Sequence, residues 1–180
     1  IQPKKLTEDR SSVTQEIITG ATHTCNLVSL NLAEILDDDT LKEMTKLSVR
    51  ILDNTIDVAA PPLPEADKHN NEYRILGVGT LGLADHLVHN GLSYDNSGDF
   101  CDKLFEKVAL AGIEASSDLA VERGSYHYFE GSDWDKGNFF GRDSKWYDSE
   151  SDNPEEWKAL RAKVRKQGMR NGGLFAIAPN

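Results

Sequence analysis

A short strand-like run that leads straight into a helix start constrains the fold of this chain most. Residues 24–29 mix β-branched with apolar residues, a composition typical of a buried strand. Asn31 follows at a position where its side chain can cap a first helical turn, and Glu34 lies three residues later, as in a capping box. We therefore expect a strand that ends at a helix, with Cys25 on the strand.

Strand-like and helical patterns alternate along the rest of the chain, which predicts the α/β class. Thr40 and Glu43 form a second capping box, and Pro61 should end the helix that follows, because proline disfavours helical geometry in the residue before it. Apolar residues at three- and four-residue steps predict the other helices. The expected helices cover residues 12–20, 40–60, 80–90, 99–123 and 154–167, and the later strands cover 73–78 and 174–178.

The spacing of apolar residues also predicts which helix faces are buried. On the helix that starts at Thr40, the predicted stripe is Leu41, Met44, Leu47, Ser48, Ile51, Leu52 and Thr55. On the final helix it is Trp157, Leu160 and Val164. The basic residues near the end of the chain are expected on a solvated face: Lys158, Arg161, Lys163, Arg165, Lys166 and Arg170.

Residues 125–153 combine many aromatic side chains with no clear hydrophobic period. A loop of this length is unusual inside a compact domain and is often functional or an interface. We therefore expect this segment to form an interface with protein outside the chain.

Composition excludes several classes of function. A formal net charge of −10 argues against non-specific nucleic-acid binding, which needs a basic surface. No apolar run approaches the ~18 residues that span a bilayer, and no signal sequence opens the chain, so we expect a cytoplasmic protein. The 2 cysteines form no C-x-x-C pair and are expected to be reduced thiols. Because the first residue is Ile1 and not methionine, we expect a piece of a longer protein.

Histidine and cysteine positions provide only weak signals for a metal. His86 and His89 lie three residues apart beside Asp85, and His23 lies two residues before Cys25. Neither pair has a third ligand at a recognised spacing. We expect no metal site in this chain.

A glycine motif offers a competing interpretation. Gly77, Gly79 and Gly82 match the G-x-G-x-x-G fingerprint of Rossmann-type nucleotide-binding modules. Against it, residues 70–74 are too polar for a central parallel strand, and the acids near the required spacing, Asp99 and Asp102, lie at a helix start. The other interpretation is that these glycines allow close packing of a strand and a helix.

Five motifs in a fixed order resemble one known family. The first is the run from Cys25 to Leu32, in which Asn26, Leu27, Ser29 and Asn31 also match. The others are residues 52–57, residues 64–66, the run from Arg74 to Asp85, and residues 176–179. Together they resemble the catalytic, large subunit of ribonucleotide reductases.

The resemblance implies a fold and an activity. The family's large subunit is a ten-stranded α/β barrel, so residues 1–180 are expected to be a single, helix-rich segment of that barrel and incomplete alone. The expected reaction reduces ribonucleotides, with diphosphates favoured, to deoxyribonucleotides by thiyl-radical chemistry. Cys25 would be one of two redox-active thiols, with its partner outside this chain, and Cys101 would pack in the core.

The resemblance also implies a substrate contact and partners. Pro179 and Asn180 match the first two positions of the loop that holds the substrate phosphates, although the family usually has threonine at the second. No cofactor is expected on this segment, because the radical generator belongs to a partner small subunit. The other expected partners are the remaining segments of the large subunit and a thioredoxin- or glutaredoxin-type reductant. A non-catalytic scaffold derived from the reductase is the third hypothesis.

Overall fold

The computed structural model describes residues 22–177, so the expected helix at residues 12–20 lies outside the described part of the chain. Strands and helices alternate at first, and helices dominate the second half. The elements are β1 (Leu27–Asn31), η2 (Leu32–Glu34), α2 (Asp38–Val58), α3 (Pro64–Tyr73), β2 (Gly77–Leu81), α4 (Leu83–His89), η3 (Tyr94–Asn96), α5 (Gly98–Arg123), α6 (Asp133–Lys136), η4 (Phe139–Gly141), α7 (Ser144–Glu150) and α8 (Pro154–Gln167).

A small parallel sheet forms one side of the molecule. β1 pairs with β2 in a register that places Leu27 opposite Gly77. On the other edge of β2, the N–H of Val78 donates to the carbonyl of Leu174 at 2.8 Å, and Phe175 forms a parallel bridge to Val78. β2 therefore lies between β1 and this later segment, and the predicted strand at residues 174–178 is reduced to a single bridge within the described residues.

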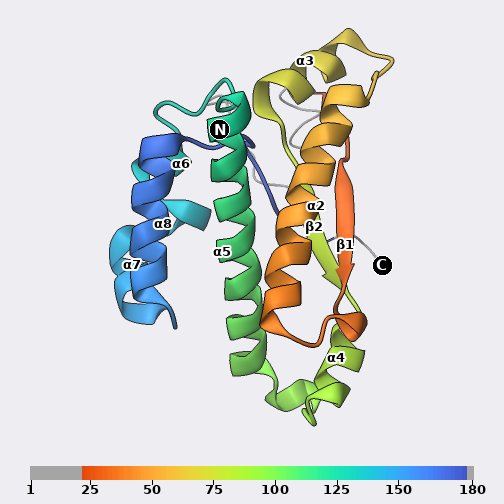
Figure 1. The fold of residues 1–180 in the computed structure, drawn as a ribbon, viewed down its shortest axis with the longest axis vertical. Helices are drawn as coiled ribbons and strands as arrows, with labels where there is room; N and C mark the ends of the chain where they lie inside the picture. The colour runs from red at the N-terminus through yellow and green to blue at the C-terminus, as the bar shows by residue number, and fades with distance from the viewer. Residues whose placement is uncertain (1–21, 178–180) are drawn as a thin grey trace.

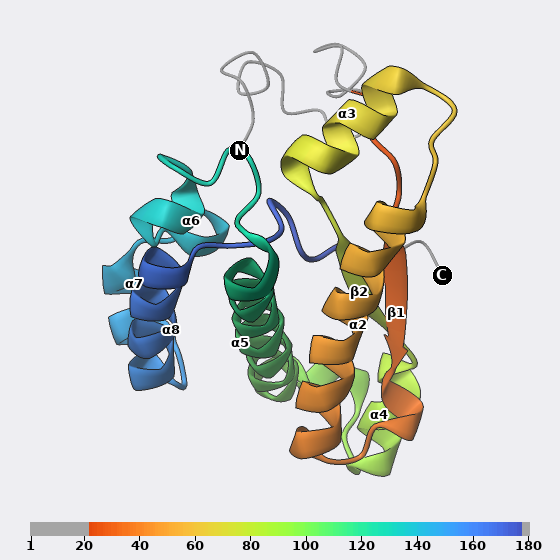
Figure 2. The same cartoon turned by 45° about the horizontal axis from the view of Figure 1, so that its top comes forward.

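Long helices cover the sheet in layers. Figures 1 and 2 show α2 against β1 and β2, α5 beyond α2, and α8 with α7 on the far side of α5. Apolar side chains from the sheet and from all these helices form one buried cluster. The described chain is thus a helix-rich α/β structure with a parallel sheet.

The first long helix begins earlier than the capping box predicted. Asp37 is its N-cap, and the Asp37 carboxylate accepts a hydrogen bond from the N–H of Thr40 at 2.8 Å. Asp38 and Asp39 then occupy the first turn, where the positive end of the helix dipole favours acids. The predicted stop before Pro61 is confirmed, since α2 ends at Val58.

The buried face of α2 differs from the predicted stripe. Leu47 and Ile51 are 46% and 49% exposed, whereas Thr45 and Asp53 are fully buried. The Thr45 hydroxyl donates to the carbonyl of Leu41 at 2.7 Å, which removes the cost of burying it. The prediction was wrong because it counted only apolar residues as candidates for the interior.

The region between α2 and α5 also differs from the prediction in its boundaries. Residues 64–73 form α3, a helix that was not predicted, with Pro64 in its first turn. The predicted strand at 73–78 lies at Gly77–Leu81 instead, and the next helix begins at Leu83. The predicted extents of α5 and α8 are confirmed, and Trp157, Leu160 and Val164 on α8 are buried as predicted.

The aromatic segment after α5 is largely core, so the prediction of an exposed interface was wrong for most of it. Trp134, Phe139 and Tyr147 are buried, and the Tyr147 ring lies 4.5 Å from that of Trp157 on α8. Trp134 lies on α6, Phe139 on η4 and Tyr147 on α7. Phe140 and Trp146 remain exposed at the surface.

Candidate functional site

Cys25 is exposed and lies two residues before β1, not on the strand as predicted. The ladder with β2 starts at Leu27. Before Leu27, the side chains of Thr24 and Asn26 bond to α3 and to the chain that follows it. The thiol therefore sits at the amino-terminal edge of a parallel sheet.

The backbone on both sides of Cys25 is anchored. The Thr24 hydroxyl donates to the Asn70 side-chain carbonyl on α3. The Asn26 amide donates to the carbonyl of Ile75 at 3.4 Å, and the Asn26 carbonyl accepts from the N–H of Gly77 at 2.8 Å. These bonds hold a short segment, residues 22–26, against α3 and the start of β2.

The second cysteine lies at the other end of the sheet. Cys101 is in the first turns of α5, next to Phe100, whose ring lies 5.6 Å from that of His86 on α4. α4 follows the end of β2, whereas Cys25 is anchored near its start (Figure 1). The five residues of β2 alone rise about 13 Å, well beyond the ~7 Å between α-carbons that a disulfide tolerates. Cys25 and Cys101 therefore cannot pair in this structure.

The three glycines of the fingerprint serve close packing. Gly77 and Gly79 lie inside β2, not in a turn after it. A Cβ on Gly77 would lie 2.2 Å from Leu27 Cδ2, and one on Gly79 would lie 2.4 Å from the carbonyl oxygen of Ala176. Gly79 therefore needs to be glycine because the obstacle is backbone, whereas at Gly77 the obstacle is the end of the flexible Leu27 side chain, which can move.

This placement argues against a Rossmann site. The fingerprint needs its glycines in the turn that leads from strand to helix, where N–H groups face a pyrophosphate. Only Gly82, with φ of +72°, occupies that turn. Residues 70–73 belong to α3, so their polarity no longer bears on a strand. The case against a Rossmann site rests instead on the positions of the glycines. Asp99 and Asp102 lie at a helix start, as predicted.

A buried charge network, missed in the sequence, joins four distant parts of the chain. The Asp53 carboxylate accepts from Arg74 Nε at 2.8 Å, Arg123 Nη1 at 2.9 Å and Asn171 Nδ2 at 3.1 Å, and it pairs with Arg170 Nε at 3.3 Å. Burial alone would raise the pKa of Asp53, but hydrogen bonds and charges, chiefly those of Arg74, lower it. The carboxylate is therefore ionised and acts as a structural hub.

The predicted solvated basic face is confirmed for Lys158, Arg165 and Lys166, which are exposed, and wrong for the other three residues. Arg170 pairs with Asp53, and Arg161 is 6% exposed and pairs with Asp148 at 2.9 Å. Lys163 bonds to Glu114 and Asp118 across to α5. One signal was available: Asp53 sits at helical spacing within an apolar stripe, where an unpaired carboxylate would be very costly.

The histidines considered as metal ligands have other surroundings. His86 is buried, and its Nδ1 lies 2.9 Å from the carbonyl oxygen of Leu32. His89 is exposed on α4. Among residues 22–177, no three histidine, cysteine or acidic side chains are arranged to hold a metal ion.

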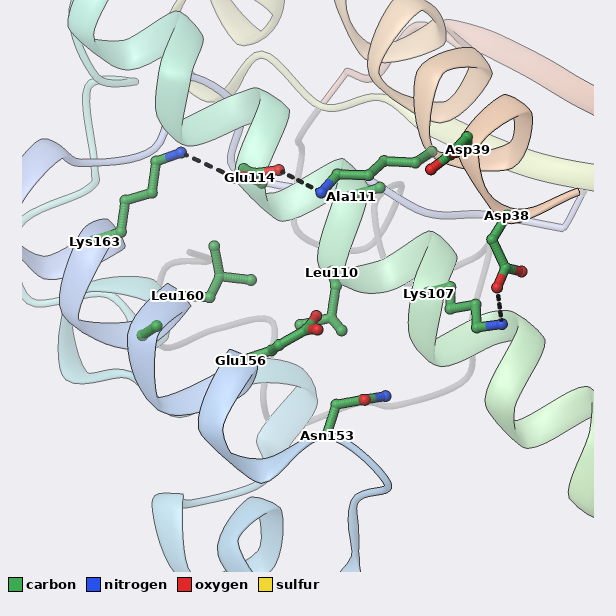
Figure 3. A pocket seen from close by; sticks show the side chains of 12 residues that line it. Asp38, Asp39, Lys107, Leu110, Ala111, Glu114, Asn153, Glu156, Leu160 and Lys163 are labelled. Carbon is green, nitrogen blue, oxygen red and sulfur yellow. Dashed lines mark hydrogen bonds and ion pairs between the residues drawn. The ribbon is translucent and has the colours of Figure 1, made fainter.

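A cleft of about 460 Å³ lies away from Cys25, between the start of α2, α5 and α8 (Figure 3). Its lining lysines face acids: Lys107 lies 2.6 Å from Asp38, and Lys163 lies 3.5 Å from Glu114. Ion pairs across the cleft leave no strongly charged surface for a ligand among these residues. None of the predicted site residues lines it.

Pro179 and Asn180 lie outside the described residues. The run that precedes them adjoins β2, where the Ala176 N–H donates to the carbonyl of Val78 at 3.2 Å. No helix in the described part of the chain is long and apolar enough to cross a membrane.

Comparison with known proteins identifies relatives along nearly the whole chain. Among them are ribonucleoside-diphosphate reductase alpha subunits from a Synechocystis species, 45% identical over 159 residues, and from Treponema pallidum, 39% identical over 181 residues. The alignments cover 88% and 97% of this chain but 20% and 21% of the relatives, so the chain spans about a fifth of their length. The alpha subunit of Enterobacteria phage T4 is 35% identical over 149 residues, which is 79% of this chain and 19% of that protein.

The sequence model of a single family accounts for the chain almost end to end. This model, described as the ribonucleotide reductase barrel domain, matches residues 6–180. The match includes β1, β2, the Asp53 hub and the anchored segment with Cys25. The chain therefore belongs to the ribonucleotide reductase barrel-domain family.

Proposed function

We propose that this chain is part of the catalytic subunit of a ribonucleoside-diphosphate reductase, with Cys25 as one of its two redox-active thiols. Family membership and the names of the relatives support the reaction class. The observation that carries the role of Cys25 is its geometry: an exposed thiol held on both sides by bonds from Thr24 and Asn26. A thiol that must meet a substrate and a second thiol needs access and a fixed backbone.

The chemistry balances with two thiols. Thiyl-radical chemistry activates the ribose, the 2′-hydroxyl leaves as water, and a hydrogen replaces it. The two electrons come from Cys25 and a second cysteine as their S–H bonds are replaced by one S–S bond. The partner of Cys25 belongs to another part of the subunit, since Cys101 lies at the far end of β2 and cannot form that bond.

We assign residues 1–180 to one segment of a ten-stranded α/β barrel, in which β1, β2 and the run through Phe175 are neighbours. The parallel ladder between β1 and β2 and the parallel bridge between Val78 and Phe175 support this assignment. Gly77 and Gly79 keep the strands and the chain after Phe175 close together.

Substrate and partners complete the proposal. Pro179 and Asn180 begin the loop that binds the substrate phosphates. No cofactor binds this segment; a small partner subunit generates the radical, and a thioredoxin- or glutaredoxin-type protein restores the thiols in the cytoplasm. Neither a membrane nor a nucleic acid takes part.

Substitution of Cys25 by serine tests the proposal. In the intact subunit with its radical-generating partner and a dithiol reductant, Cys25→Ser should lower multiple-turnover formation of deoxynucleotide at least 100-fold while substrate binding stays unchanged. Cys101→Ser is the matched control and should retain most of the turnover. Wild-type turnover by Cys25→Ser would reject the redox role and favour a scaffold.

A further inference from the structure

His69 on α3 is a buried side chain that the proposed reaction does not use. It is 6% exposed, and among the described residues neither of its ring nitrogens has a hydrogen-bond partner. Its ring stacks on Tyr73 at a centroid distance of 4.7 Å, and the His23 ring meets it edge-on at 5.1 Å. A buried imidazole without hydrogen bonds is costly, so its retention calls for an explanation.

The position of His69 links it to the thiol segment. His23 lies two residues before Cys25 and contacts the His69 ring, while Thr24 bonds to Asn70, the next residue of α3. His69, Asn70 and Tyr73 follow helical spacing and so share one face of α3. This face receives the segment that leads into Cys25.

We propose that His69 is a positioning residue for Cys25, whose neutral ring seats His23 and whose protonation releases the segment that presents the thiol. The inference deepens the proposed function and rests on the redox role of Cys25. It assigns to α3 the task of holding the thiol in place until the second cysteine and the substrate arrive.

The surroundings of His69 favour the neutral ring. The pKa of His69 is lowered from 6.5 to about 4, chiefly by burial and also by the neighbouring His23, whereas Glu72 on the same helix opposes both. Glu72 is itself engaged by the Tyr128 hydroxyl at 3.2 Å and by Lys68 at 3.9 Å. Among residues 22–177, Tyr73 stacks on the His69 ring, and the exposed His127 contacts the Tyr128 ring edge-on.

The sign of the pH dependence follows from this lowered pKa. An undocked His69 takes its ordinary pKa of 6.5, whereas the docked ring has a pKa of about 4. Docking is therefore at full strength above pH 6.5 and weakens as the pH falls from 6.5 to 4. Linkage between these two values predicts a docking equilibrium about 30-fold weaker at pH 5 than at pH 7.5.

Hydrogen exchange in the intact subunit tests this inference without any turnover. The protection factor of the Gly77 amide, which donates to the Asn26 carbonyl at 2.8 Å, is corrected for intrinsic exchange and measured at pH 7.5 and pH 5. The wild type should lose about 30-fold protection at pH 5. His69→Phe keeps an aromatic ring that cannot be protonated, so it should lose less than about threefold, whereas His69→Ala should be poorly protected at both pH values.

His89→Phe, an exposed histidine on α4, is the matched control and should behave like the wild type. Turnover at pH 7.5 adds a second measurement: His69→Ala should lower it about tenfold with unchanged substrate binding, and His69→Phe should restore it. Protection that is independent of pH in the wild type, or a pH-dependent loss retained in His69→Phe, would overturn the inference. The exchange measurement does not depend on turnover, whereas the Cys25→Ser assay does. Failure of the positioning role is therefore distinguished from failure of the redox role.

Discussion

Arg74 donates from Nε to the Asp53 carboxylate across 2.8 Å, and both side chains are almost completely buried. The two residues belong to separate motifs of the chain, one in the middle of α2 and one at the end of α3. Arg74 also ends its helix in a left-handed conformation, with φ of 49°, which aims its side chain back at α2. The backbone conformation that ends α3 and the ion pair between Arg74 and Asp53 therefore depend on each other.

Asp53→Asn should be strongly destabilising. It removes the charge that compensates Arg74, Arg123 and Arg170, and breaking a buried ion pair typically costs about 3–5 kcal/mol. Asp57→Asn is the matched control, because Asp57 is half exposed and should cost less than about 1 kcal/mol. The free energy of local opening of α2, from hydrogen exchange in the intact subunit, measures both. Equal losses of stability in the two variants would contradict the role of Asp53 as a structural hub.

The same carboxylate should contribute to acid unfolding. Its pKa is lowered in the folded state, so its stabilising contribution is present above the ordinary value of 3.8 and is lost as the pH falls through the lower folded value. Wild-type α2 should therefore open progressively below about pH 4. In Asp53→Asn that part of the pH dependence should disappear, and an unchanged acid profile would refute the assignment.

Two adjacent phenylalanines should behave very differently. Phe139 is fully buried beside Trp134, and truncation to alanine should cost about 3–5 kcal/mol. Phe140 is 53% exposed, and its truncation should cost less than about 1 kcal/mol. Thermal unfolding of the two variants gives the comparison. Similar melting temperatures for the two variants would show that Phe139 does not stabilise the core and would contradict the buried placement of the aromatic segment.

Gly79→Ala should displace the chain after Phe175. Its Cβ would meet the Ala176 carbonyl oxygen at 2.4 Å, and such overpacking typically costs about 1–3 kcal/mol. In the proposed enzyme the displaced run leads to Pro179, so the KM for the nucleotide should rise more than kcat falls. Gly98→Ala, which meets nothing within 4 Å at the start of α5, is the control and should be neutral. An unaltered KM in Gly79→Ala would show that the close contact between Gly79 and the Ala176 carbonyl is not needed for nucleotide binding.

The chain produced alone should be only marginally stable and should not reduce nucleotides. Within residues 22–177, no strand pairs with the edge of β1 that faces away from β2, and Leu47 and Ile51 are exposed, so apolar surface and unpaired backbone groups favour association. Adding the remaining segments of the subunit should raise the melting temperature, because partners that bind the folded state stabilise it. A cooperative, monomeric melt that is insensitive to those segments would indicate an independent domain.

Local sequence signals predicted the elements that local physics determines. α5 and α8 have regular apolar stripes, α8 has proline in its first turn, and glycine follows the last turn of both, so each was found with nearly correct ends. The family was likewise readable, because its motifs occur in order along the chain. Cys25 was found only through that resemblance.

What sequence reasoning missed depends on partners far away in the chain. α3 has few apolar residues and buries His69, Asn70 and Tyr73 against other segments. Its sequence therefore has no apolar stripe from which the helix could be predicted. Asp53 becomes an interior residue only because partners 21 to 118 positions away neutralise it. No window of neighbouring residues identifies those partners.

The Asp53 hub also imposes an order on biosynthesis. A ribosome delivers Asp53 and Arg74 early, Arg123 later, and Arg170 and Asn171 some 118 positions after the carboxylate. Until those last side chains emerge, the nascent α2 carries a carboxylate whose burial is only partly compensated, which keeps that face hydrated and delays its collapse. Final packing of α2, α3 and α5 therefore waits for the segment after α8, and a chain interrupted before Arg170 remains open for chaperones or proteases.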